Sequence, residues 1–368
     1  MHGRSSILDA IRAVAALVVM FGHLRSFIFA DYPTLVAPSS VTKIFYYLTG
    51  FGHEAVIVFF VLSGYLVGGS VISKNQFSWI DYLLKRLSRL WIVLVPVLLL
   101  TLMINSIGYH AGGELYLNGD AQSIASAPTD PVELGGAVFL GNITFLQTVY
   151  FPVYGDNGPL WSLANEFWYY ILFPLLYISL GFKGAQQWWG RGGKVALIGL
   201  IFSQMPLAMI EGFGVWLLGA LIHYVIKNRP SLRIGSIWVG APMLMVAIYT
   251  FHLARVGEVR DIILGLAFVA AMPFLVTLRV PFVFLKNSAT VVSNFSYTLY
   301  LIHFPIVAFI WYMFLGSKQV LPSIDSYLVF TIIALGVVSI SFVFYYLFER
   351  NTDKVRHQLK RKIKVYFP

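Results

Sequence analysis

The first apolar segment of the chain, residues 7–30, carries two side chains that could take part in chemistry. Arg12 is a permanent cation, and His23 is an imidazole that exchanges a proton near neutral pH. Eleven helical steps separate them, which places both on nearly the same helix face, roughly 16 Å apart. This arrangement suits a long substrate with anionic groups at one end and a reactive group at the other, such as a coenzyme A thioester.

A carboxylate on another segment could orient this imidazole. Residues 160–181 form an apolar segment that enters from the outer side, and Glu166 follows its start at a depth of roughly 9 Å, against roughly 10 Å for His23. A carboxylate beside the ring would orient it and leave the other ring nitrogen to abstract a proton. The alternative is that the two groups are unrelated and that each is satisfied locally.

Basic side chains gather at the opposite, cytoplasmic end of these segments. Arg86 and Arg89 are three residues apart and share one side of a helix. Guanidinium groups bind phosphates with two parallel hydrogen bonds, although anchoring by positive charge at the cytoplasmic surface is the ordinary explanation. Arg12 needs a partner inside its apolar segment, and Asp9 and Glu349 are the structural candidates.

Two further apolar segments contain polar or small residues. In residues 53–72, Ser63 and Gly64 could leave room for a pantetheine arm, but close helix packing is the simpler interpretation. In the ninth segment, Pro305 is expected to free a backbone carbonyl and to kink the helix. His303 is interpreted as a packed residue that satisfies this kink, in preference to a catalyst.

The elements that position these residues are apolar enough to cross a membrane. Of the 368 residues, 58% are hydrophobic and 11% are charged, whereas soluble domains have about 25% charged residues. We expect an all-α, polytopic transmembrane helical bundle of about ten spans with both termini in the cytoplasm. The spans are expected at 7–30, 53–72, 90–110, 160–181, 194–210, 212–226, 235–252, 262–280, 290–315 and 326–349.

This topology explains the net charge of +10. The outer side receives Arg25, Lys43, Arg255, Arg260 and Lys318, and every other lysine and arginine falls on the cytoplasmic side. The positive-inside rule accounts for that split, so no nucleic-acid partner is needed. Residues 1–350 are expected to form the transmembrane domain, and the basic cytoplasmic tail 351–368 is expected to lie against anionic lipid headgroups.

Two other features limit the chemistry and suggest a binding element. The chain has no cysteine, which excludes disulfides and thiolate nucleophiles, and no histidine or carboxylate spacing resembles a metal site. A long outer loop is expected at about 111–159, and its second part is apolar enough to form a short helix at the interface. Loops of this length often act as lids, and a plain solvated connector is the alternative.

Six motifs together resemble the acyltransferase 3 family, whose members are integral-membrane enzymes that acylate surface carbohydrates and some lipids or secondary metabolites. The motifs occur in the family's order over nearly the whole chain. They are RAVAALVVMFGH (12–23), FFVLSGYL (59–66), RLSR (86–89), PLWSLANEFWYYILFP (159–174), SYTLYLIHFPI (296–306) and FER (348–350).

The resemblance implies a membrane O-acyltransferase, most commonly an O-acetyltransferase, in a bacterial inner membrane. Acyl-CoA would enter from the cytoplasm as a substrate, and the acyl group would reach a hydroxyl of a cell-surface or lipid-linked carbohydrate. No metal is expected. The expected catalytic residues are His23 and Glu166, the expected coenzyme A contacts are Arg12, Arg86, Arg89, Ser63, Gly64 and Tyr65, and the expected structural or orienting residues are Asp9, Glu349 and His303.

The chain departs from the family pattern at two places. Many members read Ser-Val-Glu-Glu where this chain reads Ala164-Asn165-Glu166-Phe167, so one acidic residue is left and the role of Glu166 is open. Many members also have proline after Glu-Arg or Glu-Lys near the end, where this chain has Asn351.

A polytopic transporter or flippase of a polysaccharide precursor is the alternative function. Arg12, His23 and Glu166 would then form a relay for protons or substrate. Transporters often contain internal repeats, and the sequence contains none. The acceptor, the acyl length, the oligomeric state and the choice between direct transfer and an acyl-histidine are left open.

Overall fold

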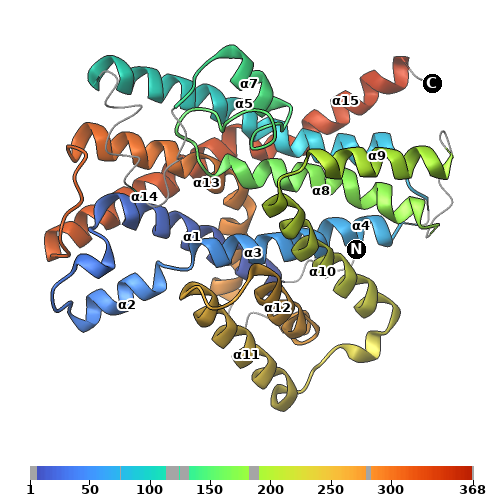
Figure 1. Ribbon diagram of the computed structural model, residues 1–368, viewed down its shortest axis with the longest axis horizontal. Coiled ribbons are helices and arrows are strands. Elements are labelled where there is room, and N and C mark those ends of the chain that lie inside the picture. Colours follow the sequence, from blue (N-terminus) through green and yellow to red (C-terminus); the bar gives the residue numbers. More distant parts are fainter. Residues whose placement is uncertain are drawn as a thin grey trace. The chain divides into compact units, whose positions relative to one another are not determined.

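The computed structural model describes residues 6–74, 76–112, 124, 132–181, 190–278 and 283–366, and these residues are helical, with loops and two isolated bridges in place of a sheet (Figure 1). The prediction of an all-α fold is therefore confirmed. The helices are α1 (Ser6–Ile28), α2 (Ser40–Leu48), α3 (Gly52–Ser63), α4 (Gly69–Ile72), α5 (Trp79–Gly112), α7 (Gly136–Ile143), α8 (Leu160–Ser179), α9 (Arg191–Gln204), α10 (Leu207–Asn228), α11 (Ile237–Arg255), α12 (Asp261–Leu275), α13 (Val283–Phe314), α14 (Ile324–Leu347) and α15 (Thr352–Tyr366).

Each of the ten predicted spans overlaps a helical stretch of this series. Among the described residues, seven stretches are long and apolar enough to cross a membrane. The predicted spans at 160–181, 194–210 and 262–280 correspond to α8, α9 and α12, which are not among the seven. Helices α9 and α12 have 14 and 15 residues, so they are shorter than the ~30 Å hydrocarbon core at ~1.5 Å per residue. The number of spans and the side of each terminus stay predictions.

The chain divides into two compact units by its internal contacts. The first consists of Met1–Ala15, His53–Tyr82 and Asn165–Ser293, and the second of Ala16–Gly52, Leu83–Ala164 and Asn294–Pro368. Helices α3, α4 and α9 to α12 therefore belong to the first unit, and α2, α7, α14 and α15 belong to the second.

Close contact between two helical backbones organises the first unit. Between α3 and α4 the chain forms a π-helical segment, η2 (Gly64–Gly68), and α10 packs directly against it. A Cβ atom on Gly64 would lie 1.9 Å from the carbonyl oxygen of Trp216, and a Cβ on Gly219 would lie 2.0 Å from the carbonyl oxygen of Val61. Only glycine permits such an approach, so helix packing accounts for Gly64.

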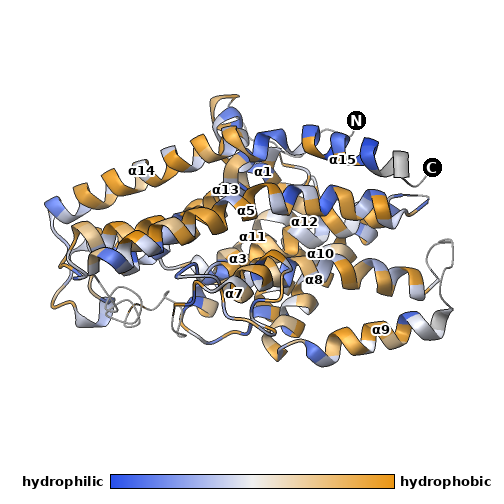
Figure 2. Cartoon of the chain, turned by 90° about the horizontal axis from the view of Figure 1, so that it is seen from above, coloured by the Kyte–Doolittle hydropathy of each residue, from blue (hydrophilic) through white to orange (hydrophobic). Residues whose placement is uncertain are grey.

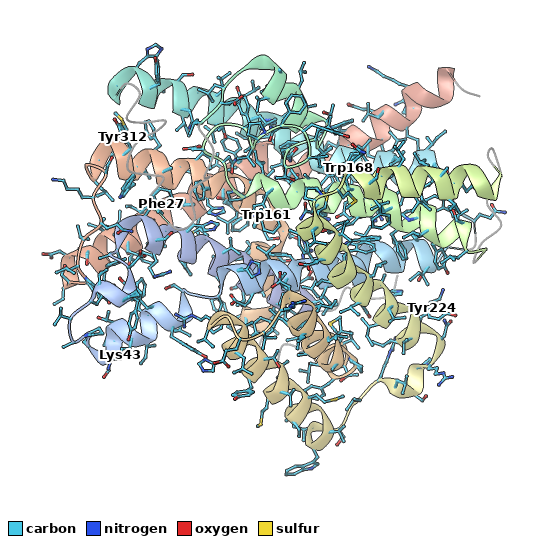
Figure 3. All side chains as sticks on the ribbon, viewed as in Figure 1. Phe27, Lys43, Trp161, Trp168, Tyr224 and Tyr312 are labelled. Carbon is cyan, nitrogen blue, oxygen red and sulfur yellow. The ribbon has the colours of Figure 1, made fainter. Side chains whose placement is uncertain are left out.

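Aromatic side chains fill the core of the second unit, where α1, α13 and α14 run side by side (Figure 1). Phe27 on α1, labelled in Figure 3, packs edge-on against Phe304 and Trp311 of α13. Phe21 lies against Phe330 of α14. Such tilted and edge-on pairs add to the stabilisation from the buried apolar area.

Helix α5 begins before the span that the sequence predicts at 90–110. It runs from Trp79 to Gly112 as one continuous helix of 34 residues, with Pro96 inside it. The basic residues of the RLSR motif therefore lie on the same rigid helix as the apolar residues that follow them.

The C-terminal helices differ sharply in polarity, and Figure 2 shows α14 as mainly hydrophobic and α15 as mainly hydrophilic. A single 3-10 turn, η5 (Glu349–Asn351), separates them. Helix α15 carries the basic residues of the predicted tail, with Lys354, Arg361 and Lys362 exposed. Its position against lipid headgroups stays a prediction.

Candidate active site

A hydrogen-bonded pair of imidazoles lies inside the second unit. Nδ1 of His23 on α1 is 2.7 Å from Nε2 of His303 on α13, and the two ring planes differ by 8°. His303 is completely buried at 0% exposure, whereas His23 is partly exposed. The edge of Phe304 packs against the His23 ring. His23 is therefore the more accessible of the two rings, and His303 supports it from the protein interior.

The helix around His303 is held by a side chain from the loop that precedes α8. Pro305 has no N–H to donate to the carbonyl of Leu301, its partner one turn earlier. Nδ2 of Asn157 donates to that carbonyl at 2.9 Å, and Asn157 is completely buried. Asn157, and not His303, therefore supplies the hydrogen bond that Pro305 removes, while Nδ1 of His303 bonds to the carbonyl of Leu299 at 2.9 Å.

A carboxylate held by two hydroxyl groups forms a second polar cluster, inside the first unit. Oε1 of Glu166 on α8 accepts hydrogen bonds from Oγ of Ser63 at 3.0 Å and from the hydroxyl of Tyr170. Nε1 of Trp216 donates to Oγ of Ser63 at 3.1 Å. The structure thus brings together Ser63 and Glu166. Because Glu166 and His23 belong to different units, the pairing of these two residues stays a prediction.

The second part of the predicted outer loop is folded and partly buried, which excludes a plain solvated connector there. Helix α7 corresponds to the predicted short helix, and Asn142 at its end is completely buried. Asn142 donates to the carbonyls of Val138 and Pro152 and accepts from the backbone N–H of Tyr154. Burial raises the pKa of the Tyr154 phenol, whose hydroxyl donates to the carbonyl of Leu134. Of the predicted loop, residues 113–123 and 125–131 lie outside the described residues.

The predicted phosphate-binding arginines differ in exposure. On α5, Arg86 is buried at 9% exposure and Arg89 is half-buried, while the neighbouring Lys85 is exposed. Arg12 on α1 is half-buried as well. Anchoring at a membrane surface does not require a buried guanidinium, such as that of Arg86, the first residue of the RLSR motif.

Both carboxylates proposed as partners of Arg12 are buried and hold a hydroxyl group. Oδ1 of Asp9 accepts from Oγ of Ser293 at 3.3 Å within the first unit. Within the second unit, Oε2 of Glu349 accepts from Oγ1 of Thr298 at 2.6 Å and from its backbone N–H at 3.3 Å. The pairing of either carboxylate with Arg12 stays a prediction.

Three residues at these clusters are missing from the sequence-based list: Tyr170, Trp216 and Asn157. Tyr170 lies four residues after Glu166, so helical spacing is a signal that could have identified it. Trp216 and Asn157 come from distant segments and carry no such signal. Among the described residues, no group of three or more histidines and carboxylates lies together as a metal site would require.

Comparison with protein families links these clusters to a known group of proteins. The family described as an acyltransferase domain, acyltransferase 3, matches residues 6–346. The chain belongs to the acyltransferase 3 family. The match extends from the start of α1 into α14 and contains every candidate site residue except Glu349. Seven long apolar helices among the described residues make this family member a multi-pass membrane protein.

Curated relatives share part of this acyltransferase 3 domain. An O-acetyl transferase of Shigella phage Sf6 is 30% identical over 178 residues, which cover 47% of this chain and 45% of the relative. The acyltransferase MdmB of Streptomyces mycarofaciens is 27% identical over 210 residues, 54% of this chain and 47% of the relative. The peptidoglycan O-acetyltransferase OatA of Listeria monocytogenes is 27% identical over 175 residues, which cover 45% of this chain and 23% of the relative. The matches therefore span half or less of these relatives, and no solved structure matches the chain significantly.

Proposed function

We propose that this acyltransferase 3 protein moves an acetyl group from acetyl-CoA to a hydroxyl of a cell-surface or lipid-linked carbohydrate in a bacterial inner membrane. Family membership and two relatives named O-acetyltransferases support the reaction class. The observation that carries the proposal is His23, a partly exposed imidazole on an apolar helix that is supported by the buried His303. A membrane helix retains such a group for function more readily than for stability.

His23 acts as the general base in the proposed reaction. Its ring takes the proton from the acceptor hydroxyl while the hydroxyl oxygen attacks the thioester carbonyl. The new C–O ester bond forms, the C–S bond breaks, and the proton passes to the thiolate of coenzyme A. General base catalysis of this kind contributes about 10²–10⁴-fold.

Glu166 is the second proposed catalytic residue. The hydroxyls of Ser63 and Tyr170 both bond to Oε1, which restricts the rotation of the carboxylate. A carboxylate that is held in one orientation is suited to binding a hydroxyl or an imidazolium during transfer.

Arg12, Arg86 and Arg89 are proposed to bind the phosphates of coenzyme A, and the burial of Arg86 supports a dedicated partner. Ser63, Gly64 and Tyr65 are proposed to line the path of the pantetheine arm, although the Cα of Gly64 also packs against Trp216. The basic tail is proposed to bind anionic lipid.

The experiment supplies acetyl-labelled coenzyme A to membranes that contain the full chain or a variant. His23→Ala and His23→Gln are expected to lower label transfer to glycan at least about 100-fold. His110→Ala, which removes an exposed histidine from the end of α5, is the matched control and is expected to retain transfer.

Equal labelling by the parent chain and His23→Ala would refute the general base. Movement of a glycan precursor across the membrane without label incorporation would favour the transporter or flippase. Mass spectrometry of surface glycans from cells with and without the protein would identify the acceptor by the mass increment that is lost.

A further inference from the structure

The two hydrogen bonds of His303 determine which nitrogen atoms carry a proton. The carbonyl of Leu299 can only accept, so Nδ1 of His303, 2.9 Å away, carries a hydrogen. In a neutral imidazole the other nitrogen is then an acceptor. Nε2 of His303 therefore accepts the 2.7 Å bond from Nδ1–H of His23.

His303 is in the environment that keeps an imidazole neutral. Its side chain is completely buried, and its hydrogen bonds run to His23 and to the backbone at Leu299 and Tyr300. A buried cation without a counter-charge is costly, and the Leu299 carbonyl carries no full charge. The planes of the two rings differ by only 8°. The N–H of His23 can therefore point toward the lone pair of His303 Nε2, which lies in the plane of that ring.

We propose that His303 is a positioning residue that holds His23 in the Nδ1–H tautomer, so that Nε2 of His23 is the nitrogen that accepts the hydroxyl proton. The inference rests on the proposed function of His23 as the base. After proton transfer, His23 still donates through Nδ1 to His303, so the imidazolium is hydrogen-bonded without a carboxylate. The orienting role that the sequence suggests for Glu166 then belongs to His303.

Two substitutions at position 303 separate positioning from packing. His303→Gln places a carbonyl oxygen near the former Nε2 and can still accept from His23, but it loses the Nδ1 donor. His303→Asn keeps a donor near the Leu299 carbonyl and is too short to reach His23. The inference expects kcat within about tenfold of the parent for His303→Gln and a decrease of at least about 100-fold for His303→Asn.

The Michaelis constant for acetyl-CoA is expected to stay unchanged in both variants, because a completely buried side chain is not expected to contact the donor. A purely structural role predicts the opposite order, with His303→Asn the better enzyme, and that order would overturn the inference. Elution as a single species and a melting temperature near that of the parent control for folding in each variant.

Nitrogen NMR of the purified full chain in lipid nanodiscs, with ring ¹⁵N-labelled histidine, tests the tautomer without an activity assay. His23→Gln and His303→Gln assign the two residues among the eight histidines. A protonated Nδ1 and an unprotonated Nε2 on both rings are expected, and a protonated Nε2 on neutral His23 would overturn the inference.

These experiments test the role of His303 separately from the proposed function of His23 as the general base. Full transfer by His23→Gln would refute the general base, and the NMR measurement would then decide the tautomer alone. Loss of transfer in His23→Gln together with equal activity of His303→Gln and His303→Asn would refute the role of His303 and leave the proposed function intact.

Discussion

The side-chain amide of Asn157 donates a 2.9 Å hydrogen bond to the carbonyl of Leu301, and so a loop residue fills a place in the helix that Pro305 cannot fill. Both partners are buried. The bond holds α13 at Leu301, two residues before His303, and so it connects the loop at 144–159 with the position of the imidazole pair.

Asn157→Ala is expected to destabilise the protein by about 1–3 kcal/mol, because the Leu301 carbonyl is left buried without a donor. Thermal unfolding in detergent measures the change. Asn351→Ala removes a bond of the same type, from Nδ2 to the carbonyl of Leu347, at an exposed position, and is expected to have little effect. Similar shifts in the two variants would contradict this account.

Gly64→Ala is expected to abolish stable folding or to lower the melting temperature strongly, because the added Cβ would lie 1.9 Å from the Trp216 carbonyl oxygen. Gly336→Ala adds the same atom to a helix with open space around it and is expected to be neutral or slightly stabilising. If Gly64→Ala instead folds normally and only weakens acetyl-CoA binding, the glycine serves the pantetheine arm and not the packing.

Tyr170→Phe and Ser63→Ala are each expected to lower kcat by about tenfold, because each removes a hydroxyl that orients Glu166. The double variant is expected to lose less than the product of the two losses, since both hydroxyls bond to the same oxygen. Ser339→Ala, which removes an exposed helical serine, is the control. Fully multiplicative losses would show that the two hydroxyls act independently.

Arg86→Ala is expected to raise the Michaelis constant for acetyl-CoA about tenfold or more, because a phosphate would lose a charge-assisted bidentate partner. Lys85→Ala removes the same charge from the adjacent exposed position and is expected to change it little. Equal effects of both substitutions on the Michaelis constant would show that Arg86 acts only through the general positive charge at this end of α5 and does not bind a phosphate specifically.

Much of the helical architecture follows from the sequence, because long apolar runs can satisfy their backbone in a membrane only as helices. Helix α2 was not predicted, because it has only 9 residues. Its N-terminal cap was a usable signal, since the side chain of Ser39 accepts a hydrogen bond from the N–H of Thr42. The π-helical turn after Ser63, which packs closely against α10, was not predicted from the sequence either.

The candidate site was predicted less completely. The depth of His23 and Glu166 along their helices follows from counting residues, but the partner of each depends on which helix lies beside it. His303 is 280 positions away from His23 in the chain, and no periodicity encodes that contact. Tyr170 was within reach of the sequence because it follows Glu166 by one helical turn.

The π-helical segment Gly64–Gly68 has a consequence for aligning the chain with other proteins. A π turn holds one more residue than the α-helical turn it replaces, so the residues after it are rotated by about 100° relative to an uninterrupted helix. A homologue that lacks one residue here is therefore expected to have an uninterrupted α-helix. In an alignment, a one-residue gap placed within the π turn then keeps residues that share a helix face at equivalent positions before and after the turn.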